Sequence, residues 1–180
     1  KYDYVFTEIE INGLINISRN EIKKYLKEYI NKSIFLIPIY EISNDIKNNP
    51  WIESLTIKND FKSKITINVK EFVPVAIYFD GVNYLLINDL GNLIDDTKEE
   101  KFRKLIILKG KNSSQYASNL IKEIPIELKS DIIEAHYINN RRWDLLTKKN
   151  LRILLPEINF TGAMNAFIDI YADIYSSNVS

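Results

Sequence analysis

The stretch "KITINVKEFVPVAIY", residues 64–78, marks where one folding unit of the chain ends and another begins. Its odd positions from 65 to 69 are apolar and the even ones polar, which is the pattern of a strand with one buried face. The next position in the apolar phase is Glu71, and Pro74 follows three residues later. Because proline has no N–H to give to a sheet ladder, it is expected at an edge or a boundary.

The composition is that of a folded protein with balanced charge. The 180 residues are 46% hydrophobic and 12% aromatic, which is enough for a core in one domain or two small ones. Lys and Arg number 24, as do Asp and Glu, which argues against nucleic-acid binding. The absence of cysteine removes disulfides, Cys-type zinc sites and thiol nucleophiles.

No apolar run of about 18 residues is present, so nothing in the sequence is expected to span a bilayer. The first residue is Lys1 rather than Met, from which we expect a preceding segment that targets or anchors the protein.

The first 70 residues predict a small mixed sheet backed by helices. A strand over 5–11 ends at Asn12-Gly13, and Ser18 with Glu21 then forms a capping box whose helix is expected to end near Asn31. A shorter helix over 39–46 and two strands, at 55–57 and 64–70, follow. The order strand, helix, helix, strand, strand is sufficient for an independent unit.

From residue 75 onward the pattern changes to β-hairpins. Turn signals at Asp80-Gly81 and in "DLGN" separate short apolar strands, and a helix is predicted over 114–124. Residues 133, 135 and 137 alternate as a strand, and "RRWDLLT" and "LRILLPE" predict a hairpin. A last helix, capped by Thr161, carries an apolar stripe. The stripe consists of Phe167, Ile170, Tyr171 and Ile174.

Several phrases in this order resemble the periplasmic part of the bacterial cell-division family FtsQ, called DivIB in Gram-positive relatives. They are "NPWIESLTIKNDF", "KITINVKEFVPVAIY", "YLLINDLGNLID" and "RRWDLLT" with "LRILLPE". The resemblance runs from about Phe6 to about Tyr175. It implies an α+β fold: a POTRA domain (β-α-α-β-β) at 1–72 and a mostly antiparallel β domain with flanking helices at 73–180.

The resemblance also implies a function. The family is a non-enzymatic scaffold of the divisome, anchored in the inner membrane by one N-terminal transmembrane helix and active in septum formation on the periplasmic side. Its partners are FtsB and FtsL, with FtsK, FtsW and FtsN as further candidates, and no cofactor is implied. In the family a final strand follows the last helix and recognises partners by β-strand addition. This chain stops at Ser180 before such a strand, so we expect that site to be incomplete.

Five residues are candidate protein-binding or junction residues: Glu71, Pro74, Arg141, Arg142 and Trp143. The resemblance implies that Glu71 and Pro74 lie at the junction of the two domains. Glu71 is either a partner contact or a junction carboxylate paired with a nearby Arg or Lys, since an unpaired buried carboxylate is too costly to keep. Trp143 is expected to fill the β-domain core, and the two arginines are left open between recognition and a structural role.

Other kinds of site and function have less support in the sequence. His136 is the only histidine, so neither a Ser-His-Asp site nor a two-His metal site can form, and it is expected to face water. Asp89, Asp95 and Asp96 favour a hairpin turn over a calcium loop. The alternative functions are a POTRA-type chaperone or transport module that binds extended strands, and a glycan hydrolase with paired carboxylates, for which no spacing marks a pair.

Overall fold

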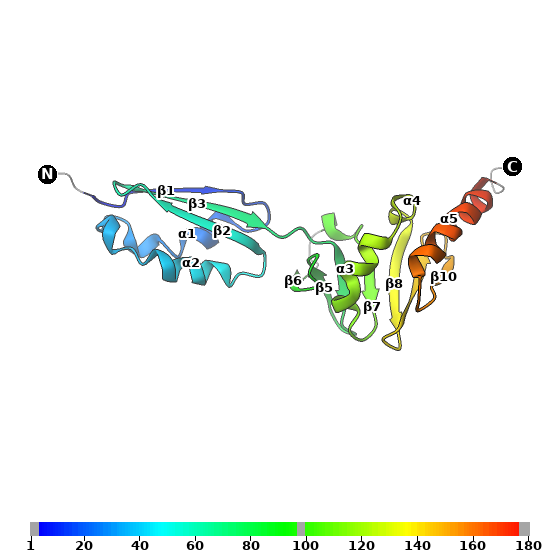
Figure 1. Cartoon of the computed structure of the whole chain (residues 1–180). Coiled ribbons are helices and arrows are strands. Elements are labelled where there is room, and N and C mark those ends of the chain that lie inside the picture. The colour runs from blue at the N-terminus through cyan, green and yellow to red at the C-terminus, as the bar shows by residue number, and fades with distance from the viewer. Residues whose placement is uncertain (1–3, 97–99, 177–180) are drawn as a thin grey trace. The chain divides into compact units, whose positions relative to one another are not determined.

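A computed structural model of the chain describes residues 4–96 and 100–176, with side chains as far as residue 170. The chain divides into two compact units, Lys1–Phe72 and Val73–Ser180. Each unit has its own β-sheet (Figure 1). Within the described ranges, none of the helices combines the length and the hydropathy that crossing a bilayer requires.

Unit 1 is a three-stranded sheet with helices on one face (Figure 1). Its elements are β1 (Glu8–Asn12), α1 (Arg19–Lys23), η1 (Lys27–Tyr29), η2 (Ile34–Leu36), α2 (Ile39–Lys47), β2 (Ile52–Asn59) and β3 (Lys64–Glu71). The strand order is β1-β3-β2, with β1 parallel and β2 antiparallel to β3. The predicted order of strand, helix, helix, strand, strand is confirmed.

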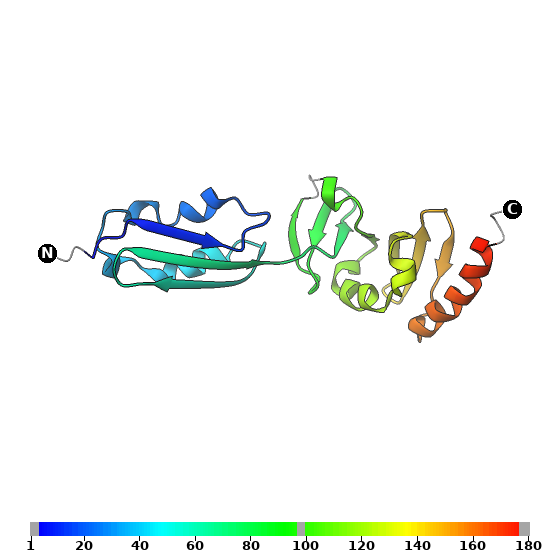
Figure 2. The ribbon, with the colours of Figure 1, turned by 90° about the horizontal axis from the view of Figure 1, so that it is seen from above.

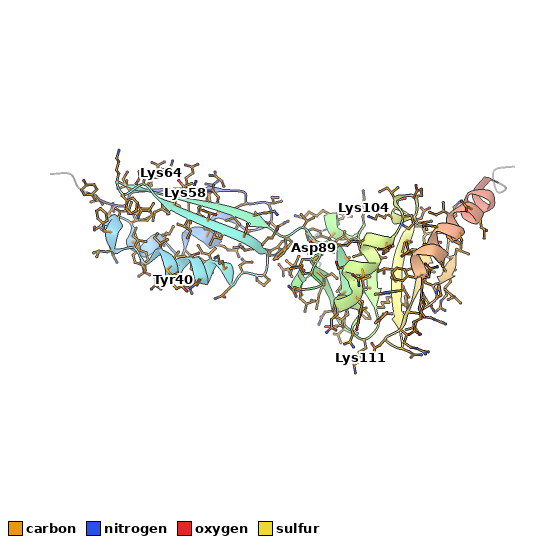
Figure 3. The ribbon with its side chains drawn as sticks, viewed as in Figure 1. Tyr40, Lys58, Lys64, Asp89, Lys104 and Lys111 are labelled. Carbon is orange, nitrogen blue, oxygen red and sulfur yellow. The ribbon has the colours of Figure 1, made fainter. Side chains whose placement is uncertain are left out.

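The core of unit 1 follows from the two periodicities of its sequence. The odd positions of β3 are buried, and α2 turns Ile42 and Ile46 toward them. Pro38 precedes α2 and Asn48 closes it, as the sequence predicts. On the opposite face of the sheet, Lys64 pairs with Glu8 and Glu10. Figure 3 shows Lys58 and Lys64 on the strands and Tyr40 on α2.

Helix α1 is shorter than predicted. Its capping box forms as expected: Ser18 Oγ accepts the N–H of Glu21, and the Glu21 carboxylate accepts the N–H of Ser18. The helix nevertheless ends at Lys23 instead of near Asn31. Residues 31–33 bond back to the N-terminal segment, through Asn31 N–H to Phe6 C=O (2.8 Å) and Phe6 N–H to Lys32 C=O (2.9 Å). This pairing requires the chain to leave the helix early, and it keeps residues 5 and 6 out of β1.

Unit 2 is a seven-stranded sheet in the order β10-β9-β8-β7-β4-β5-β6. The elements are β4 (Ala76–Phe79), β5 (Tyr84–Ile87), β6 (Leu93–Asp96), η3 (Glu100–Phe102), β7 (Ile107–Lys109), α3 (Ser113–Glu123), α4 (Ile126–Lys129), β8 (Ile132–Ile138), β9 (Arg142–Thr147), β10 (Arg152–Leu154) and α5 (Phe160–Ser176). The predicted hairpins β4–β5, β5–β6 and β9–β10 are all present. Strand β7 differs, because it pairs in parallel with both β4 and β8.

The core of unit 2 lies between the sheet and its helices, which Figure 2 shows from above. One cluster joins Leu120 of α3, Leu128 of α4 and Met164 of α5 to the strands. All three side chains are fully buried, so the three helices pack on the same core.

Two local expectations in unit 2 are wrong. A bulge between Ile132 and Glu134 shifts the alternation of β8 by one position, so Ile132 is buried and Ile133 is exposed. Helix α5 is capped by Asn159, whose Oδ1 accepts the N–H of Gly162, whereas the Thr161 hydroxyl donates to Glu123.

The apolar stripe predicted for α5 is confirmed at Phe167 and wrong at Ile170. Phe160, Met164 and Phe167 pack against the core, and Ile170 is exposed. The side chains of Tyr171 and Ile174 lie outside the described residues.

Candidate protein-binding site

Glu71, the last residue of β3, holds the loop between β1 and α1. Its side chain is 5% exposed. Oε1 accepts the backbone N–H groups of Ile15 (2.8 Å) and Ile17 (3.0 Å). Oε2 accepts the N–H of Asn16 (2.8 Å) and the side-chain amide of the same residue (2.9 Å). The partners of this carboxylate are therefore amides of unit 1, and among the described residues it makes no ion pair with an Arg or Lys.

These hydrogen bonds set the protonation state of Glu71. Burial alone would raise the pKa of its carboxyl group, but the N–H groups of residues 15–17 stabilise the anion and outweigh burial. The pKa of Glu71 therefore lies below its ordinary value. The carboxylate is charged at neutral pH, and backbone amides rather than a cation stabilise it in the part of the chain that the structure describes.

Pro74 lies in a short segment between the two sheets. The N–H of Phe72 bonds to the C=O of Trp51 (2.8 Å), and the N–H of Val75 bonds to the C=O of Ile87 (2.9 Å). The first bond belongs to unit 1 and the second to unit 2, so only Val73 and Pro74 stand between the two ladders. Pro74 has no backbone N–H, and at this position neither sheet ladder needs a donor.

Trp143 is a core residue of unit 2. It is 5% exposed and belongs to the main cluster of buried side chains. Its ring lies 4.7 Å from that of Tyr137, which in turn lies 4.9 Å from that of Tyr116 on α3. Trp143 therefore links β9, β8 and α3, as expected of a core tryptophan.

The face of the sheet opposite helices α3, α4 and α5 carries a group of charges around Asp144 of β9. Its carboxylate is 3% exposed and lies 3.3 Å from the Arg142 guanidinium and 3.0 Å from that of Arg152 on β10. Arg141 lies outside this group, 4.0 Å from Glu157. Two arginines facing one carboxylate leave this end of the sheet with excess positive charge.

His136 of β8 faces the same side and is partly exposed, as expected, and it also has a partner. Its Nε2 lies 2.8 Å from Glu134, which also binds the ammonium of Lys109 at 2.7 Å. Burial would raise the pKa of Glu134, but the hydrogen bonds from Lys109 and His136 lower it overall.

Strand β10 has an open outer edge. The C=O of Leu151 and the N–H of Leu155 bond to β9, so the backbone groups of Arg152 and Leu154 point the other way. Among the described residues no strand pairs with this side, since β10 ends the sheet order. Leu154 is 59% exposed. A hollow of about 410 Å³ adjoins the edge, and its lining includes Arg141, Arg142 and Leu154.

Comparison with known proteins assigns both units to one family. The profile described as "POTRA domain, FtsQ-type" matches residues 6–72. The profile described as "Cell division protein FtsQ/DivIB, C-terminal" matches residues 76–179, which is more than half of the chain. The chain belongs to the FtsQ/DivIB family.

Curated FtsQ/DivIB relatives match over most of the chain. The cell division protein FtsQ of Rickettsia typhi is 30% identical over 172 residues, covering 94% of this chain and 64% of that protein. FtsQ of Rickettsia bellii is 33% identical over 161 residues, covering 88% and 60%. The chain thus spans about three fifths of the length of these relatives.

One solved structure that matches this FtsQ/DivIB chain is the major extracytoplasmic domain of the trans isomer of the cell division protein DivIB from Geobacillus stearothermophilus. Its TM-score is 0.44 at 16% identity, and the match covers 62% of this chain and 99% of that chain.

In this FtsQ/DivIB chain the five candidate residues do not form one site, and Arg141 stands apart beside Glu157. Glu71 and Pro74 lie at the end of the first sheet, and Glu71 acts within unit 1. Arg142 and Trp143 are neighbours on β9 but face opposite sides of the sheet. Sequence reasoning missed Asp144 and Arg152, which join Arg142. The sequence did hold a signal for this group. In "RRWDLLT" the alternation puts Arg142 and Asp144 on one face, and the hairpin with "LRILLPE" places Asp144 opposite Leu154, two residues from Arg152.

Proposed function

We propose that this chain is the periplasmic part of a division scaffold that binds other division proteins and catalyses no reaction. Membership of the FtsQ/DivIB family supports a role in division. The family is anchored at the inner membrane, and we place this chain on its periplasmic side. Fusing a periplasm-dependent reporter to the end of the full-length protein tests that placement; activity only of a cytoplasm-dependent reporter would contradict it.

The observation that carries the binding proposal is the open edge of β10. Arg152 and Leu154 offer backbone donors and acceptors there, next to an exposed apolar side chain. An extended segment can continue the sheet at such an edge, with affinity from main-chain hydrogen bonds and specificity from side chains. Arg142 and Arg152 share the single carboxylate of Asp144 near this edge, whereas Arg141 is balanced by Glu157. The excess charge is positive, so a segment with acidic residues fits the edge best.

We assign this edge to the periplasmic segments of FtsB and FtsL. A pull-down with those segments tests the assignment, using the protein extended past Ser180. Leu154→Pro removes an outward N–H without removing a bond to β9, so it should abolish capture while the unit stays folded. Arg152→Glu should weaken capture by reversing the charge at the edge.

Lys111→Glu is the matched control. Lys111 is exposed in the loop between β7 and α3 (Figure 3), and its reversal changes the net charge by the same amount as Arg152→Glu. Capture should survive this change. If the extended protein captures neither segment, or if Leu154→Pro captures both normally, the assignment to this edge is wrong.

A further inference from the structure

A second groove lies in unit 1, between the first strand and the first helix. Its volume is about 490 Å³. Thr7 and Ile9 line one side, and Lys23, Lys24 and Lys27 line the other, with Ile30 as a further apolar wall. In Figure 2 helix α1 lies beyond β1 on the side away from β3. The groove therefore runs along the outer edge of β1.

This outer edge has unused backbone groups. The N–H of Glu8 bonds to Ser63 beside β3, so in the parallel register Glu8 and Glu10 turn their backbone groups toward β3. Ile9 and Ile11 then turn theirs outward. The Arg19 guanidinium already binds the C=O of Ile11 (3.1 Å), which confirms this direction. Among the described residues, no hydrogen bond occupies the N–H or C=O of Ile9 or the N–H of Ile11.

Both ends of the open edge are closed. On one side Phe6 is paired with residues 31 and 32, and on the other Arg19 covers Ile11. The groove thus admits a short extended segment, and a long strand does not fit.

The wall opposite this edge carries uncompensated positive charge. Lys23, Lys24 and Lys27 take part in none of the ion pairs found between described residues. No carboxylate is among the residues that line the groove. The Lys24 ammonium lies over the ring of its neighbour Tyr25, 4.9 Å from the ring centre.

We propose that this groove binds a short acidic segment of a partner protein, which adds to β1 as an extended strand. Ile9 and Ile11 would supply the main-chain hydrogen bonds and the three lysines would bind its carboxylates. A lipid headgroup or free phosphate could use the lysines, but it would leave the outward N–H groups and the apolar walls of Ile9 and Ile30 without a role. An extended acidic peptide satisfies all three features.

The test uses this chain and a fluorescein-labelled peptide of alternating Glu and Val, with a Lys-for-Glu peptide as comparison. Fluorescence polarisation should show that only the acidic peptide binds and that salt weakens it. The triple variant K23E/K24E/K27E should bind roughly tenfold more weakly or worse. Because Glu in the last turn of α1 opposes the helix dipole, K23Q/K24Q/K27Q serves as a milder second variant.

The matched control is K47E/K58E/K62E, which makes the same charge change at three exposed positions of the same unit. It should bind like the unaltered chain. Hydrogen exchange at the amides of Ile9 and Ile11 should slow when the acidic peptide is added, because strand addition uses those N–H groups.

Three results would overturn the proposal. One is equal loss of binding in the control triple, which would mean that net charge alone matters. Another is binding without any slowing of exchange at Ile9 and Ile11. The third is lysine-dependent binding to phosphatidylglycerol vesicles, with none to the acidic peptide. The groove lies in unit 1, so failure of FtsB and FtsL capture at β10 would leave these outcomes unchanged.

Discussion

Removal of the Glu71 side chain should destabilise unit 1 strongly. In Glu71→Ala the N–H groups of Ile15, Asn16 and Ile17 lose their acceptor. A hydrogen bond to a charged group contributes about 1.5–3 kcal/mol net. The site of the Ile17 bond is buried, whereas water can replace the carboxylate in part at the other two. We therefore expect a loss of about 3–5 kcal/mol in the free energy of unfolding.

Glu71→Gln should be milder. Glutamine keeps one acceptor oxygen but turns an NH₂ group toward donors, so we expect about 2 kcal/mol of destabilisation. In a domain of this size each kcal/mol lowers Tm by about 4–8 °C, so the alanine variant should melt at least about 12 °C lower.

The chain offers one tryptophan per unit as a probe. Trp51 is buried in unit 1 and Trp143 in unit 2. In a Trp143→Phe background, urea unfolding followed by fluorescence reports unit 1 alone, and the reverse background, Trp51→Phe, reports unit 2. The Glu71 variants should shift the first transition and leave the second in place.

Glu53→Gln is the control, since it breaks only the exposed pair with Lys70 and should cost less than about 1 kcal/mol. An alanine variant of Glu71 that is as stable as this control would refute the reasoning. So would a variant whose second transition moves as far as its first.

The pH dependence has a definite sign. The folded-state pKa of Glu71 is lowered, so its contribution to stability is complete above the unfolded-state value of about 4.3. That contribution is lost as pH falls through the folded-state pKa. Unit 1 should therefore lose stability on acidification, and Glu71→Gln should show a flatter profile over that window. If the free energy of unfolding of unit 1 changed equally with pH in the two proteins, Glu71 would not be the group responsible.

Two further predictions concern packing. Gly13 has φ +85° and an added Cβ would lie 1.9 Å from the carbonyl oxygen of Val69, so Gly13→Ala should lower the stability of unit 1 by more than about 1 kcal/mol. Gly81→Ala, where φ is +107° but the space is open, should cost unit 2 less in the same urea titrations. Trp143→Ala should cost unit 2 about 3–5 kcal/mol, a loss that is followed in urea by far-UV circular dichroism because the variant lacks the tryptophan of that unit. Trp51 fluorescence should report an unchanged unit 1, and a loss in unit 2 below about 1 kcal/mol would contradict the core role of Trp143.

The elements that could be predicted are those whose signals are local. The capping box of α1, the limits of α2 and the turns of the β-hairpins depend on residues a few positions apart, and all were predicted correctly. Errors arose where distant segments decide the outcome. Residues 31–33 leave the helix to pair with the N-terminal segment, and β7 enters the sheet in parallel after a crossover.

The same limit applies to the candidate site. That Glu71 is a carboxylate at a core position was visible in the sequence, but its partners are backbone amides 54–56 residues away. No side-chain pattern marks such donors, so a partner contact or a nearby Arg or Lys was expected in their place. The bulge in β8 was likewise invisible, because it changes which of two adjacent isoleucines is buried without changing the residue types.

The bonds of Glu71 also bear on the order in which unit 1 folds. Helix α1 has five residues, too few to persist alone in water. The loop that leads into α1 is held by Glu71, the last residue of β3. Glu71 is synthesised after this loop and reaches its position only when β3 joins the sheet. The first helix should therefore become stable only when the third strand docks. In a ribosome-bound chain that has emerged from the exit tunnel as far as Lys70, the amides of residues 15–17 should exchange their hydrogens rapidly. A chain that has emerged one residue further, as far as Glu71, should protect these amides from exchange.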